Sequence, residues 1–96
     1  RQTLQLDPAH VDAHIDLGSL LLEKAELTEA REHFEKASQL NPKLAQPHNY
    51  LGKVLMHEGN VSQAIAQFEE ALRLHPDFPE AEQNLRIAKG TSAQSP

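Results

Sequence analysis

The side chains that could carry chemistry in this sequence are histidines and carboxylates. The chain has six His and no Cys, which excludes thiolate catalysis and Cys-ligated metal sites. His10 and His14 lie four positions apart, a spacing that can place both on one face of a helix and is compatible with metal binding. Asp7 and Asp12 are near them, but neither supplies a third ligand of matching spacing. His48 repeats His14 34 positions later, which indicates a structural position and not a metal site.

The carboxylates do not form a catalytic pair. Glu69 and Glu70 are adjacent, so on a helix they diverge by about 100° and cannot act as a dyad. Glu80 and Glu82 have the pattern of a solvent-facing helix surface. The sequence contains no Gly-rich phosphate loop and no Ser-centred elbow. We therefore expect no enzyme active site, no cofactor and no metal site in these residues.

Composition and charge narrow the remaining classes of protein function. The chain has 96 residues and a net charge of −5, so it offers no basic face to nucleic acid. No apolar run approaches the ~20 residues of a membrane span. Only 39% of the residues are hydrophobic, which would give a thin conventional core and favours layers that pack through small residues. The sequence begins at Arg1 without Met, so it allows no prediction of the compartment.

The chain contains an internal repeat with a period of 34 residues, because residues 11–44 align with residues 45–78. Ten positions are identical between these two units, whereas unrelated segments would share about two. The identical pairs are His14/His48, Leu17/Leu51, Gly18/Gly52, Leu21/Leu55, Ala30/Ala64, Phe34/Phe68, Glu35/Glu69, Ala37/Ala71, Leu40/Leu74 and Pro42/Pro76. The register extends in both directions, which predicts the end of a preceding unit in residues 1–8 and the start of a further one in 79–89.

Each unit is predicted to contain two helices, and the chain five in all. The predicted ranges are 9–23, 29–40, 45–57, 63–74 and 79–89. Thr28 and Ser62 are suitable N-cap residues, and Gly90 is a suitable C-terminal stop. Residues 90–96 are small and polar and are expected to form a tail or linker.

Small residues predict close packing between the paired helices. A side chain at Gly18 or Gly52 would hold the partner helix away. On each second helix, two alanines at heptad spacing share a face with one phenylalanine. The residues of these two faces are Ala30, Phe34, Ala37, Ala64, Phe68 and Ala71.

This period and its repeated residues are similar to the tetratricopeptide repeat (TPR) family. The matching motif residues are Leu17, Gly18, Ala30, Phe34, Ala37 and Pro42, and Leu51, Gly52, Ala64, Phe68, Ala71 and Pro76. The resemblance covers residues 1–89 and implies an all-α, right-handed solenoid of antiparallel helix pairs, with two full units and a capping helix. Three departures are visible: His14 and His48 replace the motif's Trp, Leu21 and Leu55 replace its Tyr, and Ala25 replaces the mid-repeat Gly that Gly59 retains.

Charge on the last predicted helix indicates a cap. Arg86 stands one repeat period after Gly52, and Lys89 stands one period after Leu55. A further helix would meet charge there, which is typical of the solvated end of a repeat array. We therefore expect the chain to be the C-terminal part of a longer TPR array.

The resemblance implies a non-catalytic protein–protein interaction scaffold. In this family the first helix of every unit lines a concave groove that holds an extended peptide or a partner helix, so the expected partner is a protein or peptide. By register, the groove side chains would be Asp12, Ile15, Ser19, Leu22, Gln46, Asn49, Lys53, Met56, Glu80, Gln83 and Ile87. Their three–four spacing places those of each helix on one face.

One family activity is disfavoured by the residues themselves. Some TPR domains bind chaperone C-termini through a clamp of Lys, Asn, Asn, Lys and Arg. The corresponding positions are Ile15, Ser19, Tyr50, Glu80 and Asn84. Only Asn84 is compatible, and Glu80 would repel an acidic terminus.

Two alternatives remain open at this point. The chain could be an accessory domain of an enzyme whose catalytic part lies outside these residues. It could also be a self-association module that forms a weak homodimer through an exposed N-terminal edge near Leu4, Leu6, Val11 and Leu20.

Overall fold

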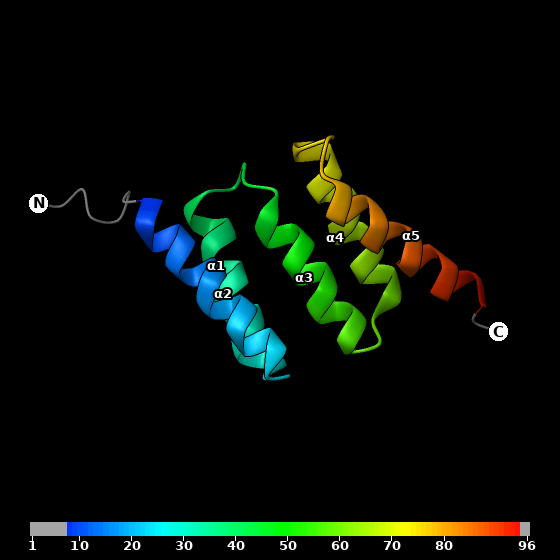
Figure 1. Cartoon of the computed structure of the whole chain (residues 1–96), viewed down its shortest axis with the longest axis horizontal. Coiled ribbons are helices and arrows are strands. Elements are labelled where there is room, and N and C mark those ends of the chain that lie inside the picture. Colours follow the sequence, from blue (N-terminus) through cyan, green and yellow to red (C-terminus); the bar gives the residue numbers. More distant parts are fainter. Residues whose placement is uncertain (1–7, 95–96) are drawn as a thin grey trace, which may run out of the picture.

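A computed structural model describes residues 8–94, which form five helices. They are α1 (Pro8–Glu23), α2 (Leu27–Leu40), α3 (Gln46–His57), α4 (Val61–Leu74) and α5 (Pro79–Gln94). Each helix packs on the next, and α3 also contacts both α1 and α5 (Figure 1). The predicted all-α solenoid of helix pairs is thereby confirmed. Residues 1–7, the predicted end of a preceding repeat, lie outside the described residues.

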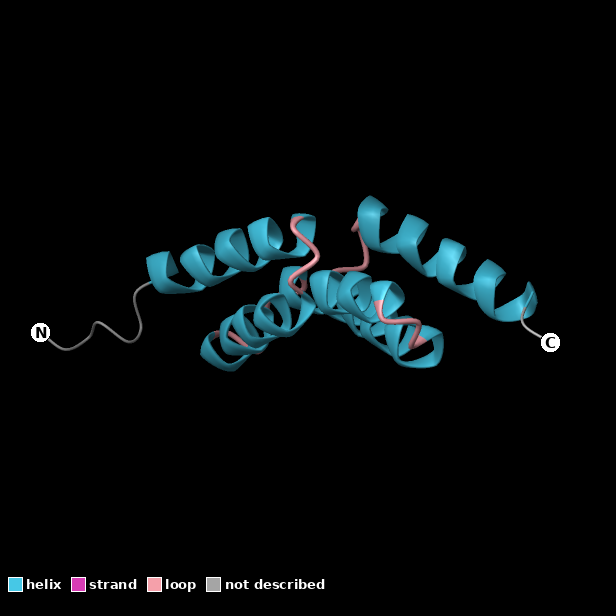
Figure 2. Ribbon diagram, turned by 90° about the horizontal axis from the view of Figure 1, so that it is seen from below, coloured by secondary structure: helices cyan, strands magenta, loops and turns pink. Residues whose placement is uncertain are grey.

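The first helices of the units form one surface. Figure 1 shows α1, α3 and α5 across the front of the molecule, with α2 and α4 behind them. In Figure 2, α1 near the N label and α5 near the C label rise at the two ends, and the other helices lie below and between them. The surface over α1, α3 and α5 is therefore concave.

Small residues make the close packing within each helix pair, as predicted. The alanines and phenylalanines of the two predicted faces are all buried. A Cβ atom added at Gly18 would lie 2.7 Å from Cε1 of Phe34, and one added at Gly52 would overlap the ring of Phe68. Only glycine therefore lets each ring lie against the backbone of the partner helix.

The turn inside each unit is a Schellman motif. At the end of α1, the N–H of Glu26 donates to the carbonyl of Leu21 and the N–H of Ala25 to that of Leu22, both at 2.9 Å. The motif requires a left-handed residue, and Ala25 supplies it with a φ of 62°. Alanine is strained in this conformation because its Cβ approaches the backbone.

The second unit repeats this turn without the strain. The N–H of Asn60 donates to the carbonyl of Leu55 at 2.8 Å, and that of Gly59 to the carbonyl of Met56 at 3.1 Å. The left-handed residue is Gly59, with a φ of 84°. Glycine adopts this conformation at no steric cost.

The predicted helix starts and N-caps are wrong by about half a turn. Helices α2 and α4 begin two positions before the predicted 29 and 63, so Thr28 and Ser62 lie inside the first turn. Glu26 and Asn60 occupy the N-cap positions, and neither side chain makes a capping hydrogen bond. The Schellman motif explains the shift, because it ends one helix so tightly that the next begins at once.

The predicted stop at Gly90 is also wrong, because α5 continues to Gln94. Gly90 does not adopt a left-handed φ. A glycine ends a helix when it turns left-handed, whereas inside a helix it costs only about 1 kcal/mol relative to alanine. Most of the predicted polar tail is therefore helical. Within residues 8–94, no helix is long and apolar enough to cross a membrane.

The two repeated histidines join the helices of each pair. Nδ1 of His14 lies 2.9 Å from Nδ1 of His33, and Nδ1 of His48 lies 2.8 Å from Oε1 of Gln67. These contacts occupy equivalent positions of the two units. The structural interpretation of His14 is supported by this contact, and among residues 8–94 no three His, Cys, Asp or Glu side chains are grouped to hold a metal ion.

The His14 contact has an electrostatic consequence. Burial and the positive charges of His33, Lys36 and His10 lower the pKa of His14 below its ordinary value of 6.5. The folded state therefore takes up a proton at His14 less readily than the unfolded chain does.

We predict that the two left-handed residues respond oppositely to exchange. Ala25→Gly should raise the free energy of unfolding by about 1 kcal/mol, because it relieves the strained φ. Gly59→Ala should lower it by about the same amount, because it introduces that strain. Chemical denaturation followed by circular dichroism measures both. Destabilisation by Ala25→Gly would contradict the assigned turn.

We also predict that stability falls as the pH is lowered through 6.5. Because the pKa of His14 is lower in the folded state, the unfolded chain binds more protons below that pH, and the free energy of unfolding decreases. His33→Gln copies the His48–Gln67 pair and should make the decrease shallower, since it removes one of the charges that lower the pKa. Urea unfolding at about pH 7.5 and about pH 5.5 tests this. An unchanged pH dependence in His33→Gln would contradict it.

Candidate protein-binding groove

The structure distributes the eleven predicted groove residues among three levels of burial. The exposed ones are Asp12, Gln46, Glu80, Gln83 and Ile87. Ser19, Lys53 and Met56 are half-buried, and Ile15, Leu22 and Asn49 are buried. The first two sets have side chains that a partner can reach. Whether a partner binds them stays a prediction.

The assignment of the two buried aliphatic residues to the groove surface needs correction. Ile15 packs with Val11 and Ala37, and Leu22 belongs to the cluster that contains Phe34. Both side chains lie in the core between helices, where Ile15 is 6% and Leu22 8% exposed. Neither can contact a partner directly.

Asn49 also differs from its predicted role. Its side chain is 1% exposed, and its Oδ1 accepts a hydrogen bond from Nδ2 of Asn84 at 2.9 Å. A buried amide without a partner is costly, so this bond stabilises the contact of α3 with α5. We call it the Asn49–Asn84 bridge. Asn49 therefore stabilises the packing of α3 against α5 as a buried residue.

A second polar contact joins the same helices at the surface. Nζ of Lys53 lies 3.2 Å from Oε2 of Glu80. Both side chains are substantially exposed, and exposed pairs contribute little to stability because water and salt screen them. The Lys53 ammonium can therefore exchange Glu80 for another carboxylate.

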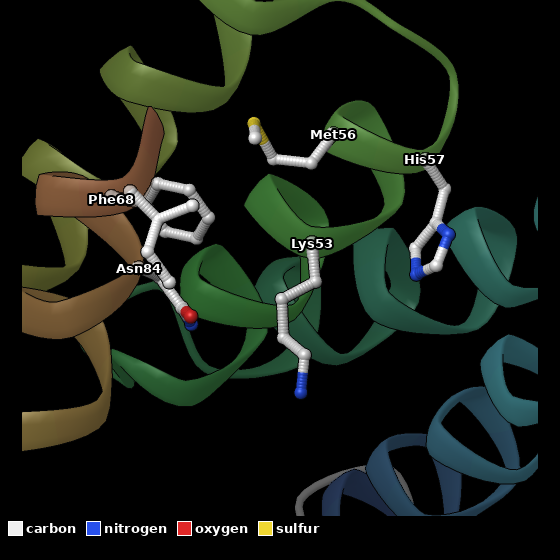
Figure 3. A pocket seen from close by; sticks show the side chains of 6 residues that line it. Lys53, Met56, His57, Phe68 and Asn84 are labelled. Atoms are coloured by element: carbon white, nitrogen blue, oxygen red, sulfur yellow. The ribbon is translucent and has the colours of Figure 1, made fainter. Parts of the chain in front are cut away.

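The structure shows an open cleft of about 260 Å³ where α3, α4 and α5 meet (Figure 3). It is lined by Lys53, Met56, His57, Phe68, Asn84 and Ile87. The prediction contained Lys53, Met56 and Ile87 of this set. It missed Phe68 on α4, Asn84 on α5, and His57, which lies at the end of α3. We call this feature the Phe68 cleft.

The equivalent place one unit earlier is filled. Tyr50 lies one repeat period before Asn84, and its ring stacks on Phe34 with centroids 4.7 Å apart and planes 1° apart. Nζ of Lys53 lies 5.3 Å from the centre of the Tyr50 ring. In the second unit, the residue that corresponds to Tyr50 is Asn84, and the one that corresponds to Phe34 is Phe68. The exchange of tyrosine for asparagine was the sequence signal that could have located the cleft.

An exposed apolar surface lies on α1, separate from the groove. Leu17 and Leu20 are 43% and 49% exposed, whereas Leu51 and Val54, their counterparts one repeat period later, are 9% and 0% exposed. Helix α2 packs on α3, while the preceding side of α1 has no described helix. We call this surface the α1 edge. Val11, predicted to belong to it, is buried, and Leu4 and Leu6 lie outside the described residues.

Solved structures of TPR-containing proteins share this fold. The crystal structure of MamA superposes with a TM-score of 0.80 at 26% identity, covering 86% of this chain and 48% of MamA. A mutant O-GlcNAc transferase of Thermobaculum terrenum gives 0.80 at 33% identity, covering 91% of this chain and 17% of the transferase. PilF of Pseudomonas aeruginosa gives 0.80 at 24% identity, covering 92% and 40%. The chain thus spans less than half the length of each of these structures.

Sequence comparison identifies a family as well as a fold. No curated protein matches the chain. The family described as regulator of microtubule dynamics protein 1-3 matches residues 17–94, which include all of α2 to α5 and part of α1. The chain therefore belongs to the regulator of microtubule dynamics protein 1-3 family and has the helical-repeat fold of TPR proteins.

Proposed function

We propose that this chain is a non-catalytic interaction module whose concave surface over α1, α3 and α5 binds an extended segment of a protein partner. The observation that carries the proposal is the Phe68 cleft, which opens beside the predicted groove residues Lys53, Met56 and Ile87. Apolar walls with a few polar groups are typical of a binding site. The concave surfaces of helical repeats also offer extended contact areas.

The polar side chains around the cleft suit a peptide ligand. Gln46 and Gln83 are exposed on α3 and α5 and can hydrogen-bond a peptide backbone. The Asn49–Asn84 bridge fixes the two helices before a ligand arrives. A preformed groove loses less entropy on binding, which favours affinity.

The family description supports a particular class of partner. Its members are described as regulators of microtubule dynamics, so proteins that act on microtubules are the first partners to test. The similarity to O-GlcNAc transferase supports a second candidate function, in which the module recruits substrates for a catalytic domain outside this chain.

A peptide library tests the groove. Peptides selected on this chain should lose at least about tenfold in affinity for the double variant Lys53→Ala/Gln83→Ala, because both side chains belong to the proposed groove. Lys36→Ala is the matched control, since it removes the same charge from an exposed position on α2. Fluorescence anisotropy measures the affinities, and circular dichroism checks the fold. Equal loss in the control, or no loss in the double variant, would argue against the groove.

The α1 edge supports a proposal of weak self-association. In the second unit, the counterparts of Leu17 and Leu20 are covered by a helix, so a second copy of the chain could cover this edge. The net charge of −5 opposes the approach of two copies. Salt should therefore strengthen the association by screening this repulsion.

Sedimentation equilibrium over a wide concentration range tests the edge. We expect concentration-dependent dimerisation that increases with salt and is abolished by Leu20→Glu. Ile87→Glu is the control, because it places the same charge at an exposed apolar residue on α5. A strictly monomeric mass at high concentration and high salt would refute self-association.

A further inference from the structure

We infer that the Phe68 cleft accepts one aromatic side chain from a partner segment that also carries a carboxylate. This inference rests on the proposed function and specifies the chemistry of the ligand. Two equivalent places in the chain differ in one residue, because Tyr50 stands in the first and Asn84 in the second.

In the first place, two aromatic rings form a stacked pair. The ring of Phe34 has the backbone of Gly18 close to it and the stacked ring of Tyr50 against it. Stacked rings gain dispersion and electrostatic energy beyond the area that they bury. The repeat itself therefore shows which group fits beside this phenylalanine.

In the second place, no aromatic ring within residues 8–94 stacks on Phe68. The backbone of Gly52 approaches the ring of Phe68 even more closely than that of Gly18 approaches Phe34. Asn84 occupies the register position of Tyr50, and its amide is engaged with Asn49. Figure 3 shows Asn84 beside Phe68, with Met56 and Lys53 on the neighbouring helix. The Phe68 cleft lies beside this shorter side chain, and Phe68, which is 1% exposed, forms part of its inner wall.

The walls of the cleft favour an aromatic occupant. Met56 offers a thioether, which makes favourable contacts with aromatic rings. Ile87 is 53% exposed and would be covered by an inserted side chain. The volume of about 260 Å³ lies below the range of about 300–1,000 Å³ that holds drug-sized ligands, so it suits a single side chain.

The charge of the lining favours an acidic partner. Lys53 lines the cleft and no carboxylate does, although the chain as a whole carries a net charge of −5. A carboxylate of the partner can replace Glu80 on Lys53, because that ion pair is exposed.

The probe for this inference is N-acetylphenylalanine, which carries one ring and one free carboxylate. Titration into ¹⁵N-labelled protein should give saturable NMR shifts at the amides of Lys53, His57, Asn84 and Ile87. A ligand of this size binds with a dissociation constant of about 1 mM. N-acetylphenylalanine amide should bind several-fold more weakly, and N-acetylalanine should cause no saturable shifts.

Two variants separate the ring from the charge. Asn84→Tyr rebuilds the arrangement of Tyr50 on Phe34, so it should fill the cleft and abolish binding. Gln39→Tyr, at an exposed position on α2 outside the groove, should leave binding unchanged. Lys53→Met should keep binding of the ring but remove the preference for the carboxylate over the amide. This second variant tests the inference even if Asn84→Tyr does not fold.

The outcomes also distinguish this inference from the proposed function. Shifts spread away from the cleft, or undiminished binding to folded Asn84→Tyr, would overturn the aromatic pocket. Selected peptides that depend on Lys53 and Gln83 but lack aromatic residues would do the same while leaving the groove proposal intact. Binding of the probe together with peptides that ignore both groove residues would refute the groove proposal alone.

Discussion

Each helix pair depends on the contact of one phenylalanine ring with one bare glycine backbone. Phe34 lies against Gly18, and Phe68 against Gly52, so closely that a single methyl group would collide with the ring. The contact sets the distance between the paired helices, and the buried alanines on either side of the ring follow from that distance. Because the rings occupy the centre of each pair, their outer faces are where the next unit packs. The residue that covers each outer face therefore determines whether the surface there is filled or hollow.

The same contact explains how much of the fold could be predicted. Glycine, alanine and phenylalanine recur with the period of the repeat, and this periodicity indicated the five helices and their pairing. The helix starts were harder to predict from the sequence, because they depend on the turn that precedes each helix. Ala25 adopts a left-handed φ although its residue type disfavours it, and the position of the turn thus follows from tertiary packing. Gly90 shows the converse, since a residue typical of helix ends lies within one.

The candidate site was predictable only where it follows the repeat. Lys53, Met56 and Ile87 belong to the register of the groove, and the structure places them together at the Phe68 cleft. Asn49 was misassigned because the separation from its partner, Asn84, exceeds the repeat period by one position. The repeat period alone cannot predict a contact between residues whose separation differs from that period. Only the packing of α3 against α5 brings these two amides together.

The Asn49–Asn84 bridge has a mechanical consequence for the solenoid. At the corresponding junction between α1 and α3, Ile15 stands in the place of Asn49, and it shares an apolar cluster with Tyr50. Apolar contacts are non-directional and tolerate small sliding movements, whereas a buried amide pair requires a fixed distance and angle. Under tension or thermal bending, the solenoid should therefore flex at the α1–α3 junction and keep the α3–α5 junction rigid. The two junctions would then differ in stiffness, and bending of the solenoid would concentrate between α1 and α3.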